Sequence, residues 1–353
     1  MKKHKILITA ILSAIALTAC SLESTEQPTT SIAKVSEQGT TEKTTQAETT
    51  EAETTTESNL PEYAKVGEMV CSDTWNVALL YAKEYDSIDS DFFQDKPTDG
   101  NKYLALFFDV KNVSGKNDFF NTMYFEGYAD DYSVNAQITL NKPDDYPSVG
   151  GDVDAGRMSR GVIVYEVPAD WSKFEIVYKD GIWTSHKTAS FVIGKEDLSP
   201  TDYVFDGLVH GDYVFDESLK TEIGTEINDD SWNVKFLDYK TYDSLGDGFL
   251  EEKAKDGHEF AVFFLEAKNT SSADDYFNSL YFRSYVDGYL TDSSIVFGDI
   301  DGYSSMSGDV ASGKMIKGYI AFEIPKEWKN IEVIYDDGTL VENKVAVFAV
   351  TNK

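Results

Sequence analysis

The sequence predicts an all-β protein in which two tandem immunoglobulin-like β-sandwich domains follow a signal peptide and a disordered stalk. Three observations support this class. The sequence repeats itself at a constant offset of 157 residues. Each copy contains short segments rich in β-branched and aromatic residues, separated by Gly, Asp, Asn, Ser or Pro, and no long stretch has helical periodicity. Several such strands per copy, with turns at regular spacing, are typical of a two-sheet sandwich, although a closed barrel is an alternative.

The first element is an export signal. Three lysines within the first five residues precede an uncharged run from Ile6 to Ala19, which is the pattern of a positive n-region and a short apolar h-region. The run is shorter than the roughly 20 residues that a permanent membrane helix needs. Leu17-Thr18-Ala19-Cys20 resembles a bacterial lipobox, where lipoprotein signals are cut before a cysteine that carries a diacylglyceryl group. We expect residues 1–19 to be removed and Cys20 to be lipidated.

The second element is a tether. Between Ser21 and about Leu60 the composition changes to Thr, Glu, Ser, Gln and Ala, without any aromatic residue. Such a segment cannot bury enough apolar surface to offset its chain entropy, so residues 20–62 are predicted to be disordered. Two acyl chains hold a protein stably on a bilayer. The expected location is therefore the outer face of the cytoplasmic membrane, lipid-anchored and extracellular.

The duplication defines the two domains, predicted at residues 63–195 and 221–353. Asp73-Thr-Trp-Asn-Val77 matches Asp230-Ser-Trp-Asn-Val234, and Gly151-Asp152-Val153 matches Gly308-Asp309-Val310. Solenoid repeats run about 20–50 residues, so a period this long indicates two copies of a whole domain. Strands in the first copy are predicted around Trp75–Tyr85, Tyr103–Asn112, Phe120–Tyr128, Gly161–Pro168, Phe174–Tyr178 and Thr188–Ile193.

The linker, residues 196–220, is predicted to be ordered. It contains Asp202-Tyr-Val-Phe-Asp206 and Asp212-Tyr-Val-Phe-Asp216, joined by a Gly-bounded connection, Gly207 to Gly211. Two alternating runs around such a connection are typical of a hairpin or of paired edge strands. We therefore expect a fixed relation between the domains.

The charge excludes some partners. The chain of 353 residues has 62 acidic and 31 basic side chains, a formal net charge of −31. Binding to a phosphate backbone needs clustered Lys and Arg, so nucleic acid is not expected as a partner, nor is an anionic membrane surface. The membrane is expected as a partner only through the lipid anchor.

No catalytic or metal-binding motif is found. His186, His210 and His258 stand singly, and the sequence has no His-Glu-x-x-His, no Cys-x-x-Cys, no Gly-x-Ser-x-Gly and no phosphate-binding glycine loop. Cys71 is the one thiol left after lipidation, so no intrachain disulfide is expected. We expect no enzyme activity, no cofactor and no metal.

Two further features of the sequence are candidates for ligand binding. Paired acidic residues, such as Asp130-Asp131 and Asp144-Asp145, could ligate Ca²⁺, but they lack the spacing of a calcium loop, and solvated loops are the preferred interpretation. The loop Tyr146 to Gly156 and its copy Tyr303 to Gly313 are the matched non-strand stretches. Tyr146, Asp152, Tyr303 and Asp309 are therefore the candidate ligand-binding residues, with a tight turn as the alternative explanation.

These residues also carry a family resemblance. The lipobox, the Thr/Glu-rich stalk, Lys111-Asn-Val-Ser114 and Gly-x-Met-x-x-Gly at Gly156–Gly161 and Gly313–Gly318 resemble the immunoglobulin-like domain of unknown function of Gram-positive surface lipoproteins. That group is similar in fold to the mycobacterial immunoprotective extracellular antigen. The resemblance implies fold and location, and it brings no catalytic residues.

The leading hypothesis is a non-enzymatic, monomeric surface lipoprotein that binds a protein or cell-envelope ligand. A glycan-binding lipoprotein is the first alternative, and it would present rows of exposed aromatic rings on a sheet face. An envelope hydrolase is the second, and it would require a cleft with convergent titratable groups.

Overall fold

The computed structural model describes residues 31–34, 63–89, 94–179, 189–203, 205, 216, 220–228, 231–246, 251–291, 298–336 and 346–352. The predicted signal peptide, Cys20 and most of the tether lie outside these residues. So do His186, His210 and most of the predicted linker hairpin. Within the described part of the chain, no helix is long and apolar enough to cross a membrane.

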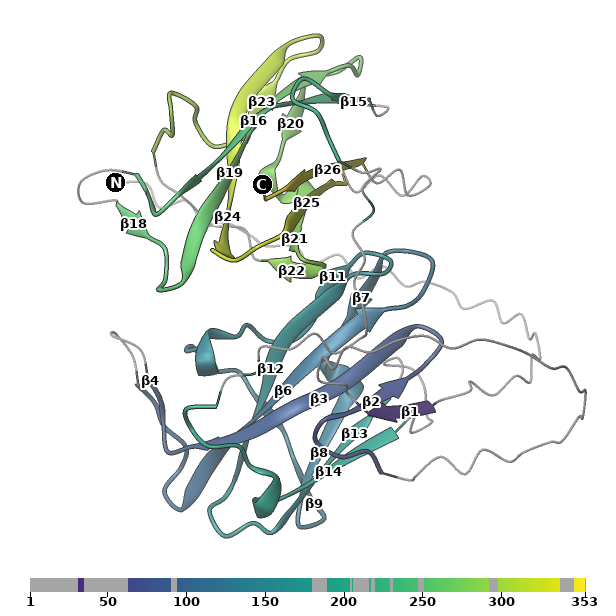
Figure 1. Cartoon of the computed structure of the whole chain (residues 1–353), viewed down its shortest axis with the longest axis vertical. Coiled ribbons are helices and arrows are strands. Elements are labelled where there is room, and N and C mark those ends of the chain that lie inside the picture. Colours follow the sequence, from purple (N-terminus) through teal and green to yellow (C-terminus); the bar gives the residue numbers. More distant parts are fainter. Residues whose placement is uncertain are drawn as a thin grey trace, which may run out of the picture.

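Domain 1 is a sandwich of two sheets, of which the first continues through β12 (Met158–Pro168) and β22 (Tyr289–Thr291) into domain 2 (Figure 1). The first sheet has the order β2 (Glu68–Cys71), β3 (Trp75–Tyr85), β6 (Asn101–Asn112), β12 (Met158–Pro168). The second has the order β14 (Ala189–Gly194), β13 (Lys173–Tyr178), β8 (Phe125–Ala129), β9 (Tyr132–Val134). Neighbouring strands within each sheet are antiparallel.

Domain 2 repeats this arrangement. Its first sheet has the order β15 (Glu226–Asn228), β16 (Trp232–Tyr242), β19 (His258–Asn269), β24 (Met315–Pro325). Its second sheet contains β22 (Tyr289–Thr291), β21 (Phe282–Val286), β25 (Asn330–Tyr335) and β26 (Ala346–Thr351). Even the β-bulge is duplicated, after Leu79 in β3 and after Phe236 in β16. The predicted all-β class and the two tandem sandwiches are confirmed.

Short elements complete each copy. Domain 1 has the two-stranded pairs β4 (Ile88–Asp89) with β5 (Gln94–Asp95) and β7 (Asp118–Phe120) with β11 (Gly151–Val153), the strand β10 (Ala136–Gln137) on β12, and the 3-10 turns η1 (Thr122–Tyr124), η2 (Pro143–Asp145) and η3 (Lys195–Asp197). Domain 2 has β17 (Ser244–Leu245) with β18 (Glu252–Lys253), β20 (Asp275–Phe277) with β23 (Gly308–Val310), and η6 (Ser279–Tyr281).

Large aromatic side chains fill each sandwich. Trp75 packs edge-on against Phe120 at 4.9 Å between ring centroids, and Trp232 packs in the same way against Phe277 at 4.8 Å. Burial of a large aromatic side chain is among the strongest apolar contributions to a core. Cys71 is a free thiol in this structure. Packing therefore holds the described part of each sandwich together without a disulfide.

A second, smaller apolar cluster lies on the outer face of the first sheet in each domain. In domain 1 it contains Leu80, Tyr81, Phe107 and Val162, with Tyr146 packed on it from the loop before β11. The corresponding cluster of domain 2 contains Phe264 and Tyr319, among others. Because the first sheet is covered on both faces, β6 reads as a nearly continuous buried run instead of a strict alternation.

One strand lies inside the segment for which the sequence predicts no secondary structure. Residues Ser31–Lys34 form β1, antiparallel to β2 at the edge of the first sheet of domain 1. An exposed sheet edge offers unpaired main-chain groups, which accept an added strand whatever the composition around it. The tether prediction, made from composition, could not anticipate this pairing.

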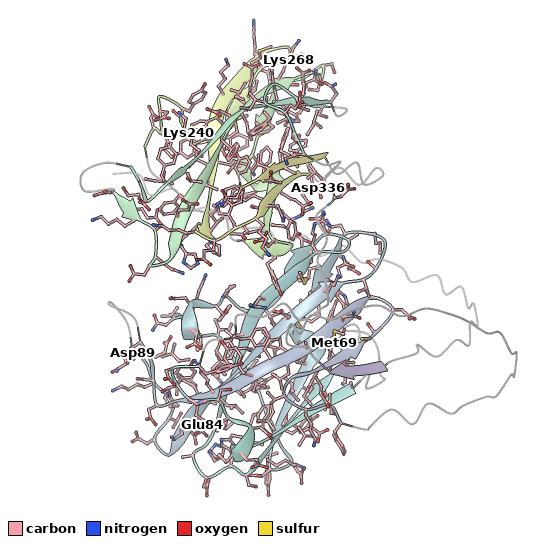
Figure 2. The ribbon with its side chains drawn as sticks, viewed as in Figure 1. Met69, Glu84, Asp89, Lys240, Lys268 and Asp336 are labelled. Carbon is pink, nitrogen blue, oxygen red and sulfur yellow. The ribbon has the colours of Figure 1, made fainter. Side chains whose placement is uncertain are left out.

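The two domains contact each other directly, at the junction of β12 and β22. Met158 and Tyr289 pair in parallel, and the Met158 amide donates to the Gly288 carbonyl at 2.9 Å. Arg157 forms a two-point ion pair with Glu332, whose side chain is fully buried. Asp154 accepts from Arg283 and from the Tyr285 hydroxyl. Figure 2 places Asp336, a further partner of Arg283, at this junction.

Candidate binding groove

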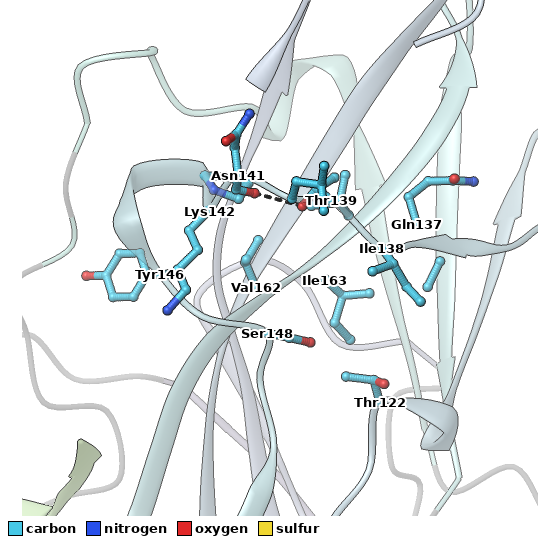
Figure 3. A pocket seen from close by; sticks show the side chains of 14 residues that line it. Thr122, Gln137, Ile138, Thr139, Asn141, Lys142, Tyr146, Ser148, Val162 and Ile163 are labelled. Carbon is cyan, nitrogen blue, oxygen red and sulfur yellow. Dashed lines mark hydrogen bonds between the residues drawn. The ribbon is translucent and has the colours of Figure 1, made fainter. Parts of the chain in front are cut away.

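The loop between β10 and β11 forms a groove against the surface of β12. Its cavity of about 340 Å³ is lined by residues 136–143, Tyr146, Ser148, Thr122 and residues 162–164 (Figure 3). The floor is apolar, since it is made by Val162, Ile163 and Val164. Such a volume lies at the lower end of the range found for small-molecule sites.

The outer wall of the groove presents exposed apolar side chains. Ile138 is 98% exposed and Leu140 is 73% exposed. The main chain between them is fixed from both sides. Gln137 pairs with Val164 in β12, and the amides of Leu140 and Asn141 donate to one oxygen of Asp95 at 2.8 and 3.1 Å. The two apolar side chains are therefore held in solvent by an ordered backbone.

A polar cluster supports the loop from behind. Asp144 accepts from the Lys83 ammonium at 2.5 Å and from the Tyr85 hydroxyl at 2.8 Å. Burial, followed by the hydrogen bond to Asp144, raises the pKa of Tyr85. Domain 2 repeats the cluster with Asp301, Lys240 and Tyr242. The hydrogen bonds from Lys240 and Tyr242 lower the pKa of Asp301, whereas burial is the main cause that raises the pKa of Tyr242 to about 12.

In each of the two acidic pairs named above, at least one carboxylate thus has structural partners. Asp130 accepts from the amides of Ser172 and Lys173 and from the Ser172 hydroxyl, so it fixes the turn that leads into β13. Asp287 holds the corresponding turn before β25. Over the described ranges, no group of three or more His, Cys, Asp or Glu side chains is placed to hold a metal ion.

The four candidate ligand-binding residues predicted from the sequence lie in separate places in the structure. Tyr146 lies in the groove wall and packs edge-on against Phe107 at 5.7 Å. Asp152 is exposed in β11, where it pairs with Phe119, and its carbonyl faces the Tyr285 hydroxyl of domain 2 at 3.4 Å. Tyr303 packs on Phe264 at 5.0 Å, and Asp309 is exposed in β23. The structure therefore brings only Tyr146 into the groove.

Sequence reasoning missed the two residues that mark the groove. Ile138 and Leu140 alternate with Gln137 and Thr139, which is a strand-like pattern that was available in the sequence. An alternation of this kind predicts that one face is buried, whereas here the apolar face is the exposed one. Lys142 is the ionisable group, besides Tyr146, in the described lining. This set suits binding better than proton transfer.

The comparisons with known proteins agree with a duplicated β-domain. Residues 64–188 and residues 221–346 each match the model of a family described as a domain of unknown function, DUF4352. No curated protein matches the chain.

Solved structures with some similarity come from bacteria. A "putative lipoprotein" of Bacillus subtilis, ycdA, is 22% identical with a TM-score of 0.28, and the match covers 35% of this chain and 38% of that one. The yjhA protein of Bacillus subtilis is 15% identical with a TM-score of 0.28, covering 37% and 97% of the two chains. A β-sandwich protein of Clostridium difficile is 12% identical with a TM-score of 0.27, covering 38% and 93%.

Proposed function

Since this chain belongs to the DUF4352 family of unknown function, we propose its role from its own geometry: a lipid-anchored extracellular binding module without catalysis. The groove of domain 1 would bind an apolar segment of a protein or cell-envelope partner. The observation that carries this proposal is the pair Ile138 and Leu140, which are exposed beside an apolar floor on an ordered backbone. Exposed apolar side chains grouped at a groove mark an interaction site.

The location is proposed from the first twenty residues. The lysines before Ile6 and the Leu17-Thr-Ala-Cys20 pattern support export and lipidation at Cys20. The similarity in fold to the mycobacterial antigen stays a prediction.

Glycan binding is less well supported by the exposed aromatic side chains. Phe119, Tyr132 and Tyr276 are exposed, but they belong to β7, β9 and β20 in different parts of the molecule. Stacking on a sugar polymer needs several rings on one surface. An apolar peptide or acyl segment fits the groove better.

The proposal can be tested with a displayed library of random peptides selected on the mature chain. We expect enriched peptides rich in apolar residues, and we expect the double variant Ile138→Ser, Leu140→Ser to bind them at least about tenfold more weakly, because two anchors of the interface are lost. The control is Ile223→Ser, Leu280→Ser, which removes two exposed apolar side chains of domain 2. Equal affinity of the two double variants for the selected peptides would refute the groove as the binding site.

A further inference from the structure

The chain that leaves domain 1 covers the part of the β3 edge that β2 leaves free. This covering segment consists of residues 198–203 and Phe205. Leu198 forms a parallel bridge with Ala82, and the Ser199 amide donates to the Ala82 carbonyl at 2.9 Å. The Lys83 ammonium donates to the Thr201 carbonyl at 2.9 Å, and the ring of Tyr203 meets that of Tyr81 at 5.2 Å. Leu198 and Ser199 thus join the free edge of β3 through a single parallel bridge, and the chain then turns, since the Tyr203 amide donates to the Pro200 carbonyl at 3.1 Å. A peptide that hydrogen-bonds to a sheet edge in this way uses a short form of β-augmentation.

Domain 2 has the same strand edge, and no residue of the described ranges covers it in this way. β15 pairs with β16 only over Asn233–Lys235, so the half of β16 from Leu237 to Tyr242 has no neighbour on that side among the described residues. Tyr239 pairs with Phe263 in the register in which Ala82 pairs with Leu106. The Tyr239 carbonyl therefore faces the side from which Ser199 reaches Ala82 in domain 1.

The two copies of one ion pair differ in solvent exposure, as expected if only the copy in domain 1 is covered. In domain 1 the side chains of Lys83 and Asp144 are 1% and 18% exposed, whereas their counterparts Lys240 and Asp301 are 48% and 44% exposed. Figure 2 shows Lys240 at the flank of domain 2. The same hydrogen-bonding groups are thus buried under a peptide in one copy and open in the other.

The side chains around the open edge indicate what it would bind. Phe264 and Tyr303 occupy the places of Phe107 and Tyr146, so the apolar floor is retained. Asp238 stands where Tyr81 receives the ring of Tyr203, and its carboxylate accepts a hydrogen bond from the Tyr239 amide. Its charge also acts on the nearby Lys240 and Tyr242. An aromatic side chain suits Tyr81, whereas a basic side chain suits Asp238 by charge.

We propose that the edge of β16, residues Leu237–Tyr242, is a docking site for an extended peptide segment of a partner protein. The segment joins the sheet edge through parallel main-chain hydrogen bonds, as Leu198 and Ser199 do at Ala82 of β3, and it places a basic side chain against Asp238. This site lies in domain 2 and is independent of the groove in domain 1.

The test uses a fluorescent octapeptide with the sequence of residues 198–205 in which arginine replaces the tyrosine, added to the full mature chain in detergent. We expect saturable binding and hydrogen-exchange protection of residues 238–242 in the unmodified protein. Asp238→Lys should weaken binding at least tenfold, and a peptide with glutamate in place of that arginine should bind Asp238→Lys better than it binds the wild type. Glu327→Lys, an equal charge change at an exposed turn residue after β24, is the control.

Several outcomes would overturn the proposal. One is the absence of saturable binding at millimolar peptide. Another is protection on β3 instead of β16, which would mean that the peptide only displaces the covering segment of domain 1. A third is equal weakening by Glu327→Lys, because the loss would then come from the net charge of the protein and not from the edge of β16. The exchange measurement needs no variant, so it decides the matter even where Asp238→Lys does not fold.

Discussion

Two glycines in the middle of long strands are required by a close approach of the backbone. A Cβ added at Gly161 would lie 2.5 Å from the Cα and N atoms of Val149, and one at Gly318 would lie 2.7 Å from the Ser304 carbonyl oxygen. The loop before β11 runs directly on β12 here, since the Val162 amide donates to the Pro147 carbonyl at 2.8 Å. Only glycine permits this contact, and the same loop forms the groove.

We expect Gly161→Ala to destabilise domain 1 by about 1–3 kcal/mol or more, because backbone atoms cannot move aside as a flexible side chain can. Urea unfolding followed by tryptophan fluorescence measures the change. Gly115→Ala is the matched control, since no heavy atom lies within 4 Å of its added Cβ. Similar losses in both variants would show that the cost is a general one of replacing glycine.

At the level of elements, the two domains contact each other through different surfaces. Because the domain is duplicated, each of these surfaces also has a counterpart in the other copy, and the counterparts differ in sequence. The start of β12 in domain 1 contacts β22 and β25 in domain 2, since Arg157 pairs with Glu332 and Arg160 donates to the Tyr289 hydroxyl. In the other copy, the counterparts of Arg157 and Glu332 are Lys314 and Glu175. Lys314 is exposed, whereas Arg157 is mostly buried against Glu332. Two-point pairing with a carboxylate is a property of arginine that lysine lacks.

Arg157→Ala should therefore lower the free energy of unfolding by about 3–5 kcal/mol, because the fully buried Glu332 carboxylate loses its guanidinium. Small-angle scattering should also show a broader distribution of distances between the domains. Lys314→Ala changes the same position of the other copy and should have little effect on either measurement. An Arg157→Ala variant as stable and as compact as Lys314→Ala would contradict this role of the ion pair.

The sequence predicted the strands well because their signals are local. Alternation and turn residues around Phe174 and Tyr178 depend on neighbours a few positions away. The domain contact could not be predicted, since Arg157 and Glu332 are far apart in the chain and each resembles an ordinary surface charge. The linker residues predict a fixed relation between the domains through a hairpin, whereas the described contact is made by β12, β22 and the ion pairs beside them. The groove was missed because alternation predicts a buried apolar face, whereas Ile138 and Leu140 are exposed.

At the scale of the whole molecule, two electrostatic effects oppose each other. The net charge of −31 makes the folded chain repel itself near neutral pH. Against this, local hydrogen bonds lower the pKa of four carboxylates. The main cause of each lowered pKa is a side-chain hydrogen bond. Its donor is Lys179 for Glu126, Ser172 for Asp130, Asn101 for Glu166 and Lys240 for Asp301. Each of these carboxylates therefore favours the folded state in its ionised form.

Because of these two opposing effects, the melting temperature should pass through a maximum at about pH 5. Between pH 8 and that point, protonation reduces the net charge toward zero at the isoelectric point of about 4.3 and relieves the repulsion. The four carboxylates have folded pKa values below their ordinary values of 3.8 and 4.5, so the stability they add is complete above those values and is lost as the pH falls through the folded ones.

Scanning calorimetry from pH 8 to pH 3 at about 0.02 and about 0.5 M NaCl separates the two effects. Salt should raise the melting temperature at pH 8, because it screens repulsion between exposed charges, and it should have a smaller effect near pH 5. Below about pH 4 the melting temperature should fall at both salt concentrations. A continuous rise down to pH 3 would mean that the four local hydrogen bonds contribute no stability. An unchanged melting temperature with salt at pH 8 would mean that the acidic side chains are spaced widely enough to avoid repulsion.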